Sequence, residues 1–193
     1  MEKAAIGFRV KSGWATVVLV AGPVTAPRVV DRRRVELADP AIPDSRQPYH
    51  AAFEPFEEAS AKRVAQLVRV VEQFSARSVA EVIERYRADG HCLSGVAIVV
   101  GGGADPSTIK NDHIRAHASE GRLFREVVEE AARKGGLTPS VTLEKQLFAK
   151  ASRAIRRPED RLKAEVTALG KGLGRPWRGV EKAAALAAWM LLA

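Results

Sequence analysis

The sequence has little cysteine and no long hydrophobic run, and each shortage excludes a class of protein. A single cysteine, Cys92, excludes a disulfide within the chain and a cysteine-rich zinc module. The longest apolar run, 183–193, is rich in alanine and too short to cross a bilayer. The apolar stretch 4–20 is interrupted by Arg9 and Gly13, which does not suit a signal peptide. We therefore expect a cytoplasmic protein with no membrane partner.

The composition indicates one globular domain with a surplus of positive charge. The 193 residues are 46% apolar and 28% charged, which suits a single domain spanning 1–193 with a real core. Lysine and arginine number 31 against 23 acidic residues, for a net charge of +8. Such a surplus favours acidic partners, DNA or RNA first, although an inert basic surface would have the same composition. A homodimer is also compatible with these numbers.

The first part of the chain predicts β-structure. Residues 4–20 and 28–37 have the β-branched and alternating patterns of strands, joined by a short link that favours an antiparallel hairpin. Residues 39–55 are rich in Pro, Asp, Ser and Gln, which predicts a long loop. A short edge strand is possible within it at 49–53.

The middle of the chain predicts two helices and a buried strand. Residues 57–74 have an apolar stripe at helical spacing. Ser78 with Glu81 resembles a capping box, which predicts that a second helix begins there and ends at Gly90. The continuous apolar run 96–100 predicts a central strand that is parallel to a neighbour.

The last part of the chain alternates helix and strand again. Asp105-Pro106 resembles an N-cap and first helical turn, so we expect a helix from there towards Lys134. We also expect a strand at 140–143 and helices at 144–155, 158–169 and 177–193. The whole pattern predicts an α/β fold: a mixed β-sheet of about five strands with helices on both faces.

This order of elements resembles the ribonuclease H-like superfamily, in its Holliday-junction-resolvase (RuvC-like) branch. That branch opens with a strand of the type Ile-Gly-x-Asp-x-Gly followed by Gly-Trp, and it ends with a helix of the type Asp-Ala-Ala-Asp-Ala-Leu-Ala. Residues 145–173 are also similar in their Lys, Ala and Gly-rich character. The matching segments here are Ile6-Gly7-Phe8-Arg9, Gly13-Trp14 and Glu181-Lys182-Ala183-Ala184-Ala185-Leu186-Ala187.

The resemblance implies phosphodiester hydrolysis by two magnesium ions held between carboxylates. At the family's acid positions, however, this sequence has Arg9, Gly101 or Gly102, and Ala184, so only Glu181 matches. A cation at the first position would repel magnesium. The resemblance therefore leads us to expect a non-catalytic protein without a cofactor, acting in nucleic-acid binding or as an interaction scaffold.

Two alternatives remain open at this stage. Displaced acids, namely Asp31, Asp105 or Asp112, would restore a magnesium-dependent nuclease or resolvase. Alternatively, Gly101, Gly102 and Gly103 follow a strand and precede a helix, where exposed amides can bind phosphate or another small anion. A plain tight turn would have the same three glycines.

Several basic residues are candidates for contact with the phosphate backbone. Trp177 could stack on a base or pack into the core, and the arginines could pair with nearby acids instead. The candidates for nucleic-acid binding are Arg32, Arg34, Arg153, Arg156, Arg157, Arg175, Trp177 and Arg178.

One further pattern is a weak metal-site candidate. His113, His117 and Glu120 lie on one face if this stretch is helical, and a His-x-x-x-His pair can bind a metal. The zinc-protease pattern requires a glutamate directly after the first histidine, and Ile114 is there instead. Two solvated histidines are the simpler interpretation.

Overall fold

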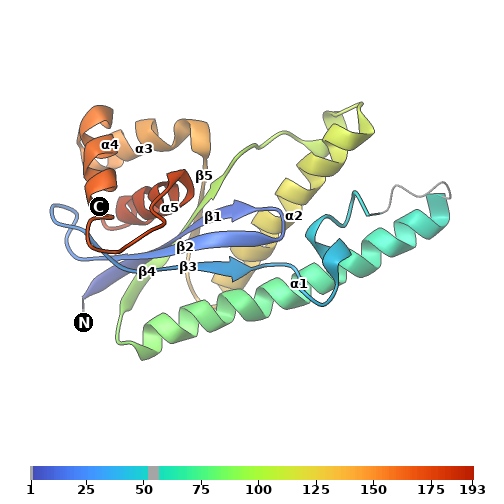
Figure 1. Ribbon diagram of the computed structural model, residues 1–193, viewed down its shortest axis with the longest axis horizontal. Coiled ribbons are helices and arrows are strands. Elements are labelled where there is room, and N and C mark those ends of the chain that lie inside the picture. The colour runs from blue at the N-terminus through green and yellow to red at the C-terminus, as the bar shows by residue number, and fades with distance from the viewer. Residues whose placement is uncertain (1, 52–56) are drawn as a thin grey trace.

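A five-stranded sheet forms the centre of the protein. The computed structural model describes residues 2–51 and the chain from Glu57 to Ala193. The strand order is β3-β2-β1-β4-β5 (Figure 1). β2 is antiparallel to both β1 and β3, whereas β4 runs parallel to β1 and β5 runs parallel to β4. The strands are β1 (Lys3–Lys11), β2 (Trp14–Ala21), β3 (Arg28–Glu36), β4 (Cys92–Val100) and β5 (Pro139–Leu143).

The β1–β2 turn corrects one prediction. Residues 4–20 are not a single strand, because Gly13 has a φ of 80° and reverses the chain, so that Lys11 pairs with Trp14. The predicted antiparallel hairpin exists between β2 and β3. The predicted central parallel strand at 96–100 is also confirmed, as the buried end of β4.

Two long helices cover one face of the sheet. They are α1 (Glu57–Ala88) and α2 (Asp112–Lys134), and the N-terminal end of α1 reaches beyond the strands (Figure 1). The helix start predicted at Ser78 is wrong, since α1 is continuous through it. Val71, Ser75 and Val79 are all buried at a spacing of four, so the stripe that packs on the sheet passes straight through the local capping pattern.

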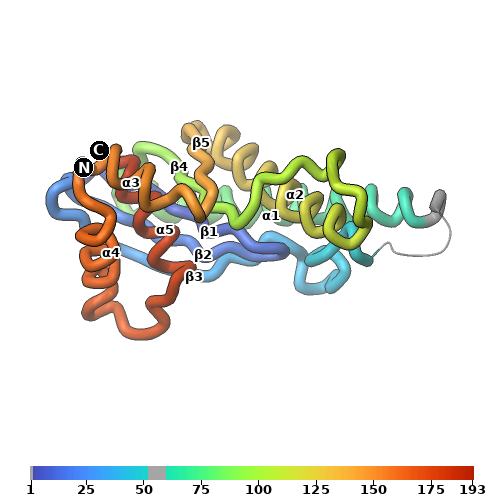
Figure 2. The backbone as a smooth tube through the Cα atoms, turned by 90° about the horizontal axis from the view of Figure 1, so that it is seen from above, coloured from blue at the N-terminus to red at the C-terminus, as the bar shows by residue number. Residues whose placement is uncertain are grey.

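Three shorter helices cover the other face. They are α3 (Leu147–Ile155), α4 (Glu159–Ala168) and α5 (Gly179–Met190), and the first two pack around α5 (Figure 1). The hydrophobic core is correspondingly divided in two by the sheet. The two ends of the chain lie close together at one end of the molecule (Figures 1 and 2).

The packing of α5 on β1 depends on a glycine. A Cβ atom added at Gly7 would lie 1.9 Å from the carbonyl oxygen of Ala184, which no side chain can tolerate. Alanines along α5, including Ala184 and Ala188, are fully buried in this contact. The helix backbone therefore lies directly against the strand.

The connecting segments contain short 3-10 turns. The loop after β3 contains the turn Pro43–Arg46, and the described part of the suggested edge strand, 49–51, is also a turn, whereas residues 52 and 53 lie outside the described residues. Asp105 caps the turn Pro106–Thr108, and Asn111 caps α2, which therefore begins later than 105. Within the described residues, no helix is long and apolar enough to span a membrane.

Candidate functional site

An ion pair between buried Arg9 and partly exposed Glu144 lies at the carboxyl edge of the sheet. Arg9 is 1% exposed, and its Nη2 donates to Glu144 Oε2 at 2.5 Å while Nη1 donates to the Val10 carbonyl at 2.6 Å. Among the described residues, no group accepts a hydrogen bond from Arg9 Nε. The hydrogen bond from Arg9 lowers the pKa of Glu144, whose side chain is 46% exposed. The guanidinium is thus neutralised by one carboxylate at the edge of the sheet.

Glu144 is a site residue that the sequence did not single out. It directly follows β5, in the turn Glu144–Gln146. Because β1, β4 and β5 are parallel, their carboxyl ends meet at one edge of the sheet. An acid placed immediately after the last predicted strand was therefore the available signal.

Some of the positions that the resemblance aligned with the family's acids meet at the carboxyl edge of the sheet, where Arg9 ends near the loop after β4. A Cβ atom added at Gly101 would lie 3.4 Å from Arg9 Nη2, and Gly102 lines the same small hollow as Arg9. Arg9 pairs across the ladder with Thr16, and Thr16 lines a second hollow together with Glu181. Glu181 itself is 8% exposed and accepts the backbone N–H of Arg178 at 2.7 Å, so its carboxylate caps α5.

The three displaced acids lie elsewhere. Asp31 accepts hydrogen bonds from Arg33 and from Tyr86 of α1, which places it on the other side of the sheet. Asp105 caps Ser107, and Asp112 pairs with Arg115 at the start of α2. Each of these three acids therefore pairs with a group that stabilises the structure around it, and not with Arg9 or Glu181.

Some of the basic candidates bind the protein itself, and others are exposed. Arg34 does both, since it is exposed but pairs with Glu36 at 2.6 Å and lies over the Trp14 ring. Arg32 donates to the carbonyls of four consecutive residues, 173–176, and so fixes the loop before α5. Arg157 pairs with Glu165 at 2.8 Å and lies over the Trp189 ring. Trp177 is half-buried, and its Nε1 donates to the Val166 carbonyl at 3.0 Å. These contacts are those of packing residues.

The exposed members gather around two neighbouring hollows. The first, here called the β3–α5 hollow, has a volume of about 450 Å³ and is lined by Arg34, Arg178 and Glu181 among others. The second, the glycine-loop hollow, has a volume of about 580 Å³ and is lined by Lys171 and Arg175. Pro176 and Arg178 line both hollows. Arg153 and Arg156 are exposed on and just after α3 and line neither.

The loop 101–103 faces α2 across a separate hollow of about 290 Å³. Gly102 and Gly103 line it together with Arg122, Arg125 and His117. Both arginines already pair with Glu126, and Asp105 also lines the hollow. Anion binding by these glycines stays a prediction.

The weak metal candidate gains a third histidine. His113 and His117 lie one turn apart on α2, and His50 from the loop before α1 packs against both rings. Glu120 is fully buried beneath them. No sequence pattern pointed to His50, which is 63 residues away from His113 along the chain.

The sheet begins with an antiparallel meander of β3, β2 and β1, which parallel strands β4 and β5 continue, and α5 crosses β1. This arrangement is that of a ribonuclease H-like fold. Among solved structures, it is similar to RuvC of Thermus thermophilus in complex with a Holliday junction substrate, with a TM-score of 0.56 and 15% identity over 97% of this chain and 91% of that chain. A second Thermus thermophilus RuvC structure has a TM-score of 0.53 and 16% identity over 97% and 92%. No family model and no curated protein matches the sequence. The predicted RuvC-like fold is confirmed.

Proposed function

We propose that this protein binds nucleic acid through its phosphates and does not hydrolyse it. The observation that carries this proposal is the Arg9–Glu144 pair, which puts a buried cation at the sheet position where the resemblance implies a metal-binding acid. Support for a nucleic-acid partner comes from the basic hollows and from the fold, since a RuvC with this fold has been solved with a Holliday junction.

The donor set around Arg9 does not fit the two magnesium ions that the fold family implies. Magnesium prefers several oxygen ligands, and two-metal hydrolysis requires them to converge. Here, among the residues that the structure describes, the carboxylate that contacts Arg9 is that of Glu144, which the guanidinium already engages, and the Glu181 carboxylate caps α5. A positive charge within contact distance of the metals would also repel them.

The two hollows offer positive charge to a phosphate backbone. Arg34, Arg175 and Arg178 are exposed at their rims, and Arg178 belongs to both. Phosphate contacts of this kind fix the position of a nucleic acid without reading its sequence. We therefore expect binding that depends strongly on salt and weakly on sequence.

Binding is tested by fluorescence anisotropy of labelled duplex, single-stranded and four-way-junction DNA across a salt series. For duplex DNA, Arg34→Glu with Arg178→Glu should weaken binding and reduce the slope of log K against log salt by about two, since each phosphate contact contributes close to 0.9. The matched control is Arg69→Glu with Arg85→Glu, which changes charge equally on exposed positions of α1. Absence of binding at low salt, or equal losses in both variants, would remove the proposal and favour the scaffold role.

Hydrolysis is tested separately. Branched DNA incubated with the protein and Mg²⁺ or Mn²⁺ should stay intact. Cleavage that is lost in Glu181→Ala, while the variant keeps its thermal stability and DNA affinity, would establish the alternative, a metal-dependent nuclease with rearranged carboxylates.

A further inference from the structure

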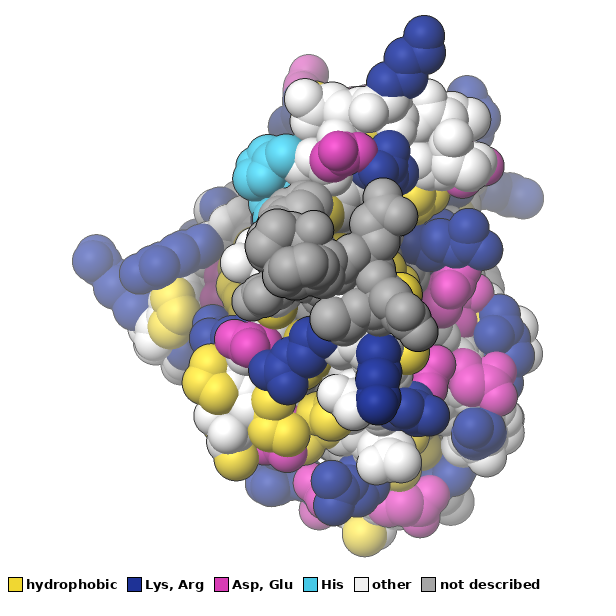
Figure 3. Space-filling view, turned by 90° about the vertical axis from the view of Figure 1, so that its right-hand side faces the viewer, with side chains coloured by type: hydrophobic (Ala, Val, Ile, Leu, Met, Phe, Trp, Pro, Cys, Tyr) yellow, Lys and Arg dark blue, Asp and Glu magenta, His cyan; other side chains and the backbone are white. Residues whose placement is uncertain are grey.

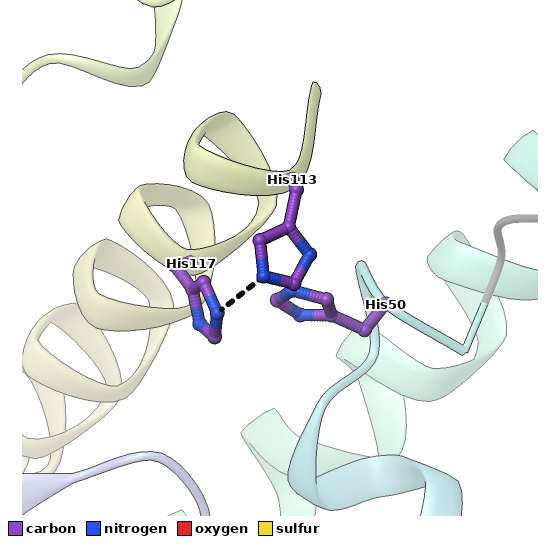
Figure 4. A group of neighbouring side chains, drawn as sticks. All are labelled: His50, His113 and His117. Atoms are coloured by element: carbon purple, nitrogen blue, oxygen red, sulfur yellow. Dashed lines mark hydrogen bonds between the residues drawn. The ribbon is translucent and has the colours of Figure 1, made fainter. Parts of the chain in front are cut away.

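Three histidines from two distant segments turn their ring nitrogens toward one point. The histidine cluster consists of His50, from the loop between β3 and α1, and His113 and His117, from the first turns of α2 (Figure 4). One ring nitrogen from each lies within 4.8 Å of those of the other two. His113 and His117 are exposed, and histidine side chains reach the surface at this end of the molecule (Figure 3).

The spacing of one pair of these nitrogens suits a metal ion. Zinc binds imidazole nitrogens at about 2.0–2.1 Å in tetrahedral geometry, which places two such nitrogens roughly 3.3 Å apart. The Nε2 atoms of His113 and His117 are 3.2 Å apart. The same distance also fits a single N–H···N hydrogen bond, so the spacing of this pair does not decide between them.

Glu120 provides the second observation. It is fully buried, and its Oε1 lies 2.8 Å from His50 Nδ1, so the carboxylate holds this ring through its Nδ1 atom. Its Oε2 lies 3.9 Å from His117 Nδ1 and has no hydrogen-bond partner among the residues that the structure describes. A buried carboxylate needs compensating positive charge, and an imidazole–hydrogen-bond–carboxylate arrangement is the usual support of a metal-bound histidine.

We propose that His50, His113 and His117 bind one divalent cation of the zinc class, with Glu120 holding their rings in position. Imidazole ligands favour Zn²⁺, Co²⁺, Ni²⁺ or Cu²⁺ over Mg²⁺, which prefers oxygen. Three protein ligands leave a fourth position for water or another ligand. The cation would tie the loop before α1 to α2, and its binding free energy would add to the stability of the fold. This proposal does not depend on the proposed nucleic-acid binding.

The test is a metal titration of the purified full chain after treatment with a chelator. We expect one Zn²⁺ per chain by competition with a chromophoric chelator, and a Co²⁺ complex with the visible absorption of tetrahedral coordination. Zn²⁺ should also raise the thermal midpoint of unfolding, because a ligand of the native state stabilises it.

Variants assign the site. His113→Ala and His117→Ala should each reduce Zn²⁺ affinity by more than about 100-fold, and Glu120→Gln by about 10- to 100-fold. His91→Ala is the matched control, since His91 is the one remaining histidine and is not part of the cluster, and it should leave binding unchanged. Because His113 and His117 are exposed, their variants should fold, and circular dichroism checks this.

The proposal is overturned by any of three results. They are absence of Zn²⁺ binding at micromolar concentration, binding that survives His113→Ala combined with His117→Ala, and binding that is lost in His91→Ala. The first result would leave the His113–His117 contact as a hydrogen bond between rings.

Discussion

The two faces of the sheet are built differently. Between the sheet and the helices α1 and α2, the core is filled by large side chains such as Phe8 of β1 and Phe124 of α2. Where α5 crosses β1, the contact is made by Gly7 and alanines, and the helix backbone lies against the strand. The close face also carries the buried polar groups Arg9 and Thr16. Small residues thus bring the N-terminal end of α5 near the sheet, where side chains from several elements can meet.

The largest effect should come from adding a side chain at Gly7, where α5 packs on β1. Gly7→Ala would put a methyl carbon into the backbone of α5, so we expect a loss of more than about 4 kcal/mol or failure to fold. Gly102→Ala is the control, because nothing lies within 4 Å of its added Cβ. Urea unfolding followed by circular dichroism measures both, and similar stabilities would show that α5 is not seated on β1 as described.

The next effect concerns the buried charge on the same face. Glu144→Gln leaves the Arg9 guanidinium buried without a countercharge, so we expect a loss of about 2–3 kcal/mol, below the value for fully buried pairs because Glu144 is half exposed. Arg9→Met alone should cost less, since Glu144 can turn to solvent. The double variant should be close to Arg9→Met in its free energy of unfolding. Additive losses would mean that the two residues do not act as a pair.

A smaller effect is expected from the pair on the opposite face. Burial raises the pKa of Asp31, but hydrogen bonds from Arg33 and Tyr86 lower it by more, so its pKa is below the ordinary 3.8. The stabilisation is therefore present above the unfolded pKa and is lost as the pH falls through the folded one. Asp31→Asn should cost about 1 kcal/mol at pH 7. The difference from the natural chain should shrink below about pH 4, whereas a difference independent of pH would contradict the assignment.

Much of the fold could be predicted from the sequence, because its signals are local. The apolar run ending at Val100 indicated a buried parallel strand, and the glycines and prolines marked most of the element ends. The break predicted at Ser78 failed for a physical reason: a capping pattern contributes about 1 kcal/mol, which is less than a continuous buried stripe contributes.

The candidate sites were less accessible to sequence reasoning. Arg9 was recognised as a cation at an acid position, but its partner Glu144 is 135 residues away. His50 likewise meets α2 only through the tertiary fold. No local pattern encodes such pairs; strand order brings the first together, and the course of the loop before α1 brings the second.

Arg32 couples the shapes of the two basic hollows, because it holds a loop that borders both of them. Its guanidinium donates to the carbonyls of residues 173–176. Within this segment, 174–176 line the glycine-loop hollow, and Pro176 also lines the β3–α5 hollow. A nucleic acid bound in one hollow would therefore contact a loop segment that Arg32 holds in place from β3. Arg32 also lines the β3–α5 hollow, so the residue that holds this loop is itself part of the surface that a ligand there would meet.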